Sequence, residues 1–397
     1  MDFSIRPESE ARLRAIEEFI RARLLPRETA LLSAGFGASE PELEDLRRQV
    51  RDRGWWAPAV PAELGGLGLP ILEYALVGEV LGRSIFGHYV FGAQAPDAGN
   101  VELLDRLGTE EQRQRFLLPL ARGEVRSCFA MTEPETPGSN PTELGCRAQR
   151  EGSGYLLDGR KWFATGADGA RFAIVMAVTD PAAPPRQRAT MFLVPTDTPG
   201  FTRVRNVPVM GRAGDGWLSH GEIVLDACRV PASQRLGGEG GGFAAAQERL
   251  GPGRVHHCMR WIGICERAFE LMCARGSSRR IEGEAQLADQ PLFQATVAEC
   301  RARIDAARLL VLKAAWTIDR AGFAAAAEEI SLAKFHVAEV MSEVVDAALQ
   351  AHGALGMSDD TPLAFYYAHE RAARIYDGPD EVHKLSAGRR ILKRHGR

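Results

Sequence analysis

The stretch Arg374–His383, which reads Arg-Ile-Tyr-Asp-Gly-Pro-Asp-Glu-Val-His, is the most informative part of the chain. It places a carboxylate, Asp377, directly before a glycine and a proline, a combination typical of a turn. The glycine lets the backbone bend close to a ligand. An isolated Asp-Gly pair is more often a simple turn than a functional site, so its meaning depends on the segments that accompany it.

Two other segments accompany this turn. Phe-Ala-Met-Thr-Glu-Pro occupies residues 129–134, and Lys-Trp-Phe-Ala-Thr-Gly occupies residues 161–166. In this order and spacing, the three segments resemble the acyl-CoA dehydrogenase family of FAD-dependent flavoproteins. Typical members have Tyr-Glu-Gly-Thr where this chain has Tyr-Asp-Gly-Pro, so a base is kept on an arm one methylene shorter. The Asp-Gly-Pro-Asp-Glu-Val-His form resembles a branch whose animal members act on long, branched or hydroxylated acyl-CoAs.

Composition limits the class of protein. The chain has 397 residues, of which 45% are apolar and 25% charged, so we expect an ordered globular protein with more than one folding unit. A net charge of −3 gives no reason to expect nucleic-acid binding. Seven scattered cysteines without a C-x-x-C pair favour reduced thiols.

The sequence also bears on location. No apolar run approaches the length of a membrane span, and the first residues lack the apolar core of a signal peptide. We therefore expect no membrane association and a cytoplasmic location in a prokaryote. A eukaryotic mature form that has lost a transit peptide is the alternative.

The expected fold class is α+β with three domains. Residues 1–125 show helical apolar spacing, and Thr109 with Gln112 predicts a capping box. Residues 126–236 alternate short β-prone runs with turns, as in an antiparallel barrel or sandwich. Residues 237–397 return to helical spacing. The resemblance implies an N-terminal all-α domain, a middle β-barrel and a C-terminal four-helix bundle.

Individual elements follow from the same patterns. We expect strands over 127–131, 154–157, 172–178, 190–194 and 221–225. We expect C-terminal helices over 242–250, 253–275, 290–320 and 324–352, the second of them starting at Pro252.

The resemblance implies FAD as the cofactor. Strand ends at Met131–Thr132 and Phe163–Thr165 correspond to the family's flavin-facing segments. Arg279 and Gln350 correspond to residues that reach the FAD of a neighbouring subunit, which implies a homodimer or homotetramer. Their motifs are imperfect, because Glu282 replaces an aromatic and Ala354 replaces a glycine. The residues assigned to FAD in this way are Phe129, Met131, Thr132, Gly138, Ser139, Phe163, Ala164, Thr165, Arg279, Gln290, Gln350, Gly353, Pro379 and Glu381.

Asp377 matches the family's catalytic base by motif. Some members instead carry the base on a helix immediately before an arginine, but here Gly253 precedes Arg254 and cannot act as a base. Asp380 is expected to contact cofactor or solvent. The residues assigned to the substrate are Ser139, Gly253, Arg254, Arg260, Tyr376 and Gly378.

One helix face is unusually polar. Gly253, His256, His257 and Arg260 follow at i, i+3, i+4 and i+7. Arg260 is hypothesised to read a hydroxyl on the substrate, unless a protein carboxylate neutralises it. The two histidines are either structural or functional, and we expect no metal ion, because flavin desaturation needs none.

The expected function is α,β-dehydrogenation of an acyl-CoA thioester. Asp377 would remove the α-proton, the β-hydride would pass to flavin N5, and an electron-transfer flavoprotein would accept the electrons. Two alternatives stay open: a flavin oxidase or monooxygenase on the same fold, and a non-enzymatic flavoprotein assembly partner. The acyl chain, and CoA as opposed to a carrier-protein thioester, are not readable from the sequence.

Overall fold

The structure is a computed structural model that describes residues 3–396. These residues form two compact units. The helical unit comprises residues 3–33, 69–89 and 251–396, and the sheet unit comprises Ala34–Gly68 and Val90–Leu250.

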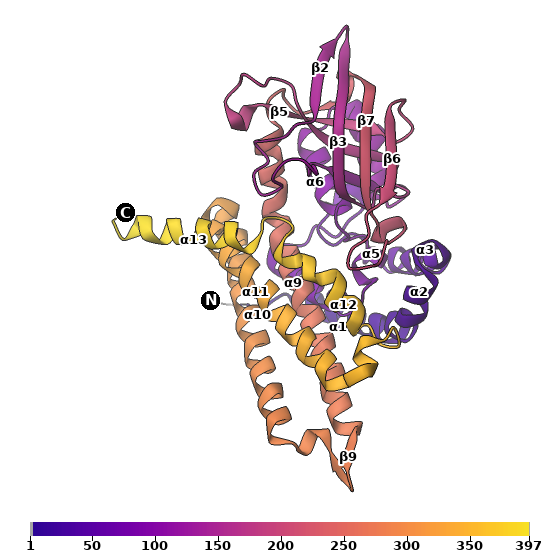
Figure 1. Ribbon diagram of the computed structural model, residues 1–397, viewed down its shortest axis with the longest axis vertical. Coiled ribbons are helices and arrows are strands. Elements are labelled where there is room, and N and C mark those ends of the chain that lie inside the picture. Colours follow the sequence, from indigo (N-terminus) through magenta and orange to yellow (C-terminus); the bar gives the residue numbers. More distant parts are fainter. Residues whose placement is uncertain (1–2, 397) are drawn as a thin grey trace. The chain divides into compact units, whose positions relative to one another are not determined.

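The sheet unit is built on one eight-stranded mixed sheet. Its order is β6-β7-β3-β2-β4-β5-β8, and β1 pairs with β4. Figure 1 shows β2, β3, β7 and β6 side by side. The strands are β1 (Ser127–Ala130), β2 (Arg147–Glu151), β3 (Gly154–Thr165), β4 (Phe172–Val178), β5 (Ala189–Pro195), β6 (Phe201–Asn206), β7 (His220–Pro231) and β8 (Arg235–Leu236).

The middle domain is therefore a sheet domain, as predicted, but not a purely antiparallel one. β1 and β2 both run parallel to β4, whereas the other pairs are antiparallel. All seven residues of β4 are buried, which explains the unbroken apolar run of this strand. The predicted strands were found, and the structure adds β2, β6 and β8.

Helices complete the sheet unit. They include α3 (Phe36–Asp52), α6 (Asp97–Leu107), α7 (Glu110–Gln112), a π-helical turn (Arg113–Leu117) and α8 (Leu118–Ala121). The capping box predicted at Thr109 is confirmed. The Thr109 hydroxyl accepts a hydrogen bond from the Gln112 backbone N–H, and the Gln112 side chain accepts one from the Thr109 backbone N–H.

Three long helices dominate the helical unit: α9 (Gly242–Ser278), whose residues 242–250 belong to the sheet unit, α10 (Pro291–Ala325) and α11 (Ala327–His352). Its shorter helices are α1 (Pro7–Phe19), α2 (Glu28–Ala34), α4 (Ile71–Gly82), α5 (Gly87–Val90), α12 (Leu363–Glu370) and α13 (Asp380–Arg394). The backbone of α10 leaves the helical conformation at Gly322. The prediction that a helix starts at Pro252 was wrong, because α9 is continuous through this position.

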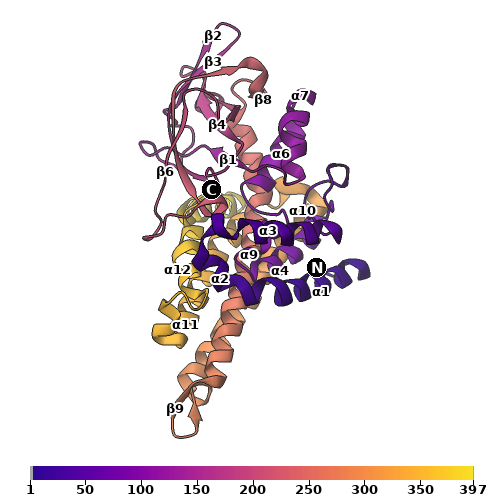
Figure 2. The ribbon, with the colours of Figure 1, turned by 90° about the vertical axis from the view of Figure 1, so that its right-hand side faces the viewer.

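The core of the helical unit lies among α9, α10 and α11. It contains the fully buried residues Trp261, Ile304 and Val337. The hairpin of β9 (Arg280–Glu282) and β10 (Ala285–Gln286) joins α9 to α10, and both views show it at the tip of this helix pair (Figures 1 and 2). A C-terminal helical domain is thus confirmed.

Candidate functional site

Two strand ends of the sheet unit lie side by side. The Trp162 N–H donates to the Thr132 carbonyl at 3.0 Å, and Nζ of Lys161 donates to the Met131 carbonyl at 3.0 Å. The loop that follows Thr132 turns back on it, because a Cβ at Gly138 would lie 3.2 Å from its methyl group. The structure therefore brings together the two segments that the sequence assigned to a flavin.

Phe163 has a strained backbone and an exposed side chain. Its φ is +50°, a conformation that bulky residues rarely adopt, and 42% of its surface is exposed. The β3–β7 register shifts between Lys161 and Ala164, so a bulge turns the ring outward. An exposed aromatic ring held in a costly backbone conformation is suited to pack against a flat ligand. Next to it, the Thr165 hydroxyl lies 3.0 Å from Nδ1 of His220.

Two predicted cofactor residues, Ala164 and Phe129, are less available, whereas a third, Ser139, is open to solvent. The Ala164 side chain is fully buried in the core of the sheet, so only its backbone could meet a ligand. The Arg249 guanidinium lies 4.3 Å from the centre of the Phe129 ring and covers one face of it. Ser139 is exposed, and no hydrogen bond holds its side chain among the residues that the structure describes.

A buried ion pair anchors both strand ends. Lys161 is 0% exposed, and its Nζ lies 2.7 Å from Oε1 of Glu133. Glu133 also accepts the N–H groups of Gly145 and Cys146 at 2.5 and 2.9 Å. Burial alone would raise the pKa of Glu133, but Lys161 and the two N–H groups outweigh it and hold that pKa below its usual value.

In the helical unit, Asp377 occupies a left-handed turn between α12 and α13. Its φ is +54°, and that of Gly378 is +99°. Glycine is required at the second position, because a Cβ there would lie 2.8 Å from Nε2 of His383. The left-handed conformation is costly for Asp377, which is not a glycine, so neighbouring contacts must hold it.

Three side chains hold this turn by its carbonyl groups. Nζ of Lys334, a fully buried residue of α11, donates to Ala373 and Gly378, both at 2.7 Å. The Asp377 carbonyl accepts from Nε of Arg254 at 3.0 Å and lies 3.1 Å from Nε2 of His383. We call Lys334, Arg254 and His383 the turn clamp.

The Asp377 side chain is left partly open. It is 19% exposed, and its Oδ2 lies 3.3 Å from Nε2 of His257, which is 13% exposed. A Cβ added at Gly253 would meet nothing within 4 Å, so this position of α9 faces open space. A partly exposed carboxylate on a rigid turn can accept a proton from a bound ligand.

Arg260 does not meet the condition set for reading a substrate hydroxyl. It donates to both oxygens of the buried Glu370, at 2.6 and 2.7 Å, and to the Tyr376 hydroxyl at 2.9 Å. Burial opposes the charge on Glu370, but Arg260 overrides it and lowers the pKa of that carboxyl well below its ordinary value. A protein carboxylate neutralises the guanidinium, so the hypothesis loses its basis.

The Tyr376 hydroxyl is also occupied, since it accepts a second bond from Nε1 of Trp261 at 3.1 Å. His256 is buried, stacks on Tyr74 and bonds with its hydroxyl, which is a structural role. The two histidines of the predicted polar face of α9 therefore differ: His256 is structural, whereas His257 faces Asp377.

The acids after the turn behave differently from each other. Asp380 was expected to contact cofactor or solvent, but it is 1% exposed and bonds to Arg374 at 2.6 Å. That expectation was wrong, because the start of α13 turns Asp380 inward. Glu381 is exposed in the first turn of α13, and Pro379 precedes it.

The residues assigned to the distant end of FAD lie at exposed helix ends. Arg279 and Gln290 flank the β9–β10 hairpin, and Gln350 and Gly353 close α11. All four are exposed. The sequence missed Lys334, although its spacing from Val337 and Met341 places it on the buried stripe of α11.

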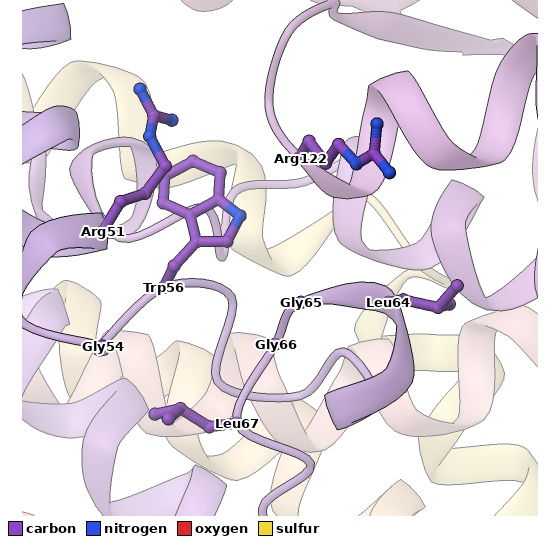
Figure 3. A pocket seen from close by; sticks show the side chains of 8 residues that line it. All are labelled: Arg51, Gly54, Trp56, Leu64, Gly65, Gly66, Leu67 and Arg122. Atoms are coloured by element: carbon purple, nitrogen blue, oxygen red, sulfur yellow. The ribbon is translucent and has the colours of Figure 1, made fainter.

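The sheet unit also contains a cavity of about 280 Å³, which none of the predicted site residues lines (Figure 3). It is lined by Arg51, Gly54, Trp56, Leu64, Gly65, Gly66, Leu67 and Arg122. Its lining carries no titratable base or nucleophile, so we do not assign it the chemistry. No helix within residues 3–396 is both long and apolar enough to cross a bilayer.

Family models match nearly the whole chain. The N-terminal, middle and C-terminal domains of acyl-CoA dehydrogenase match residues 6–124, 128–228 and 240–392. The chain belongs to the acyl-CoA dehydrogenase family. The family assigned from three short motifs is thereby confirmed, although the comparisons do not address the Asp-Gly-Pro motif that suggested a branch.

Individual relatives agree with this assignment. The chain is 46% identical over 360 residues to FadE2 of Mycobacterium tuberculosis, which is named as a probable acyl-CoA dehydrogenase. The matched region covers 89% of this chain and 86% of that protein. It is 42% identical over 391 residues to acyl-CoA dehydrogenase family member 10 of Mus musculus, covering 96% of this chain but only 36% of that longer protein. A solved structure assigned as an acyl-CoA dehydrogenase of Mycobacterium abscessus superposes with a TM-score of 0.94, at 40% identity, over 99% of this chain and 100% of that one.

Proposed function

We propose that the protein is an FAD-dependent acyl-CoA dehydrogenase in which Asp377 is the catalytic base. The observation that carries this proposal is the Asp377 turn. A carboxylate with 19% of its side chain exposed is held on a left-handed backbone by three side chains from three helices. Family membership says which reaction such a base would serve.

The residues of the sheet unit fit a flavin. Phe163 offers an exposed ring, and the strand ends at Thr132 and Thr165 offer hydroxyl and backbone groups for the polar edge of an isoalloxazine. When bound, FAD supplies the acceptor for the β-hydride. We also assign Met131, Gly138 and the backbone of Ala164 to its surroundings.

The chain's own residues would do the rest. Removing the α-proton of a thioester requires a base at hydrogen-bond distance with fixed geometry, and Asp377 offers both the carboxylate and the rigid support. Arg254 and Gly378 would shape the site through the Asp377 backbone, and Gly253 would leave room for the acyl chain. The Asp377 carboxylate would then carry the abstracted proton.

Substrate, partners and boundaries are part of the proposal. The substrate is an acyl-CoA with a long, branched or hydroxylated chain, and an electron-transfer flavoprotein is the acceptor. Exposed Arg279, Gln290, Gln350 and Gly353 would meet the FAD of a second copy in a homodimer or homotetramer. The proposed domains are 1–125, 126–236 and 237–397, and the proposed location is cytoplasmic.

The test is anaerobic reduction of the purified flavoprotein by a panel of butyryl-, isobutyryl- and palmitoyl-CoA. Asp377→Asn should bind FAD normally but reduce roughly 100- to 10,000-fold more slowly, because the amide cannot accept the α-proton. Asp346→Asn, an exposed acid on α11, is the matched control and should keep the wild-type rate.

Three results would contradict the proposal. Wild-type reduction rates in Asp377→Asn would place the base elsewhere. Rapid oxygen consumption without an acceptor protein would favour an oxidase or monooxygenase. A flavin that no acyl-CoA bleaches would favour a non-enzymatic assembly partner.

A further inference from the structure

His257 and Asp377 meet across two segments that are far apart in the chain. His257 lies on α9 and Asp377 on the turn before α13, and Nε2 of the imidazole is 3.3 Å from Oδ2 of the carboxylate. Both side chains are partly buried, at 13% and 19% exposure. A contact between a histidine and a candidate base in a partly dry environment is stronger than the same contact in water.

The His257 ring is fixed by its neighbours. It stacks on Trp261 at a centroid distance of 5.9 Å and an interplanar angle of 21°. It packs edge-on against Tyr376 at 5.1 Å and against His256 at 5.6 Å. An imidazole with rings on three sides cannot swing away from the carboxylate without disturbing them, so its Nε2 stays beside Oδ2.

The neighbouring histidines show that this contact is not a general packing feature. His256, the adjacent residue, bonds with the Tyr74 hydroxyl, and His383 reaches the Asp377 backbone carbonyl. Only His257 faces the carboxylate among the histidines of residues 3–396. Backbone and side chain of Asp377 are therefore held by different residues.

The two carboxylate oxygens are not equivalent. Oδ2 faces His257, whereas Oδ1 accepts no hydrogen bond from any residue that the structure describes. A donor fixed on one oxygen sets the rotation of the carboxylate and leaves the other oxygen free for an incoming proton. Catalytic contacts of this kind are often long before the substrate binds and shorten in the complex.

We propose that His257 is a positioning residue for the base: its Nε2–H holds Oδ2 of Asp377 so that Oδ1 points at the substrate α-carbon. The role rests on the proposed dehydrogenation, and it does not require His257 to touch the substrate. It explains why this helix face carries a histidine.

Two variants separate positioning from packing. His257→Gln keeps an N–H donor near the place of Nε2, whereas His257→Leu keeps apolar volume and removes the donor. The rate of anaerobic flavin reduction at saturating acyl-CoA should fall about 10- to 100-fold in His257→Leu and stay within about threefold of wild type in His257→Gln. His336→Gln, on α11, is the matched histidine control and should not change the rate.

A spectroscopic measurement reads the contact without any turnover. The infrared carboxylate band of Asp377 is obtained as the difference between wild type and Asp377→Asn without acyl-CoA. It should shift in His257→Leu and return in His257→Gln, with FAD content and melting temperature recorded for each variant. A merely structural histidine would change the melting temperature and leave this band in place.

The outcomes distinguish the two proposals. A wild-type rate in His257→Leu, an unchanged band, or equal rate losses in the Gln and Leu variants would each overturn the role of His257. If none of the acyl-CoA panel reduces the wild type, the proposed function fails, and the infrared band still decides whether His257 holds the carboxylate.

Discussion

Two fully buried lysines, one in each unit, support the candidate flavin segments and the Asp377 turn, and their bonded partners differ. Lys161 in the sheet unit bonds to a carboxylate, Glu133, at 2.7 Å. Lys334 in the helical unit bonds to two backbone carbonyl groups. Its ammonium also lies 5.7 Å from the Trp261 ring centre. The strand ends are held by a charge-balanced pair, whereas the turn that carries the candidate base is held by a cation.

The difference has an electrostatic consequence. Burial lowers the pKa of Lys334, while the nearby Cys258, Asp377 and Asp380 raise it. Arg254 likewise has its pKa lowered by burial and raised by Asp377. The charges of two clamp residues, Lys334 and Arg254, are therefore favoured by the neighbouring Asp377. In the sheet unit, the main influences on the pKa of Glu133 are burial, Lys161 and the N–H groups of Gly145 and Cys146.

Lys161→Met should produce the largest loss of stability. It leaves Glu133 buried and ionised without its cation, and breaking a buried pair from one side costs about 3–5 kcal/mol. Urea unfolding would measure the change in the free energy of unfolding. The double variant Lys161→Met with Glu133→Leu should recover part of the loss, because no charge is then left buried. A double variant that is less stable than the single one would contradict this account of the pair.

Lys334→Met should cost less, and it should also affect the reaction. No carboxylate is bonded to Lys334, so the loss is that of two buried carbonyl groups without a donor, about 2–4 kcal/mol together. The turn should also loosen, and the rate of flavin reduction should fall about 100-fold, because small displacements of a base are costly.

Stopped-flow reduction beside urea unfolding would check both effects of Lys334→Met. A Lys334→Met variant that is destabilised but reduces at the wild-type rate would mean that the turn does not depend on its clamp.

The sequence predicted the sheet half better than the helical half. The strand ends at Thr132 and Thr165 follow from β-prone runs and from family motifs, and the structure places Thr132 beside Trp162. The strands it missed carry little apolar pattern, since β2 buries only Ala148 and β6 has four exposed residues in a row. A strand whose side chains are mostly exposed and polar has no periodic apolar signal to detect.

In the helical unit, the motif predicted Asp377 as the base but did not predict the side chains that hold its turn. Lys334, Arg254 and His383 come from three helices, and their meeting at one turn depends on tertiary packing that no local pattern contains. Arg260 was misjudged for the same reason. Its partner Glu370 lies 110 residues later, so the pairing was invisible until α9 and α12 were placed together.

The smallest predicted effect is the pH-dependent stability that His383, one residue of the turn clamp, contributes. Burial, and then the neighbouring Arg254, lower the pKa of His383 from 6.5 to about 4. A histidine whose folded pKa is depressed favours the folded state while it is neutral. Its contribution is complete above pH 6.5 and is lost as the pH falls towards 4. The unfolding free energy of the wild type should therefore decrease by about 2–3 kcal/mol through this group between pH 7 and pH 4.

His383→Gln separates this contribution from other acid effects. Glutamine can still donate to the Asp377 carbonyl but does not titrate, so the variant should lose less stability than the wild type over the same range. His88, also buried with its pKa lowered well below 6.5 by burial, titrates in both proteins and cancels in the difference. The Lys161–Glu133 pair cancels as well, because it is the same in both proteins. Urea unfolding at pH 7, 6, 5 and 4 measures both curves. If they run parallel, the pKa of His383 is the same in the folded and the unfolded protein, and burial in the clamp does not lower it.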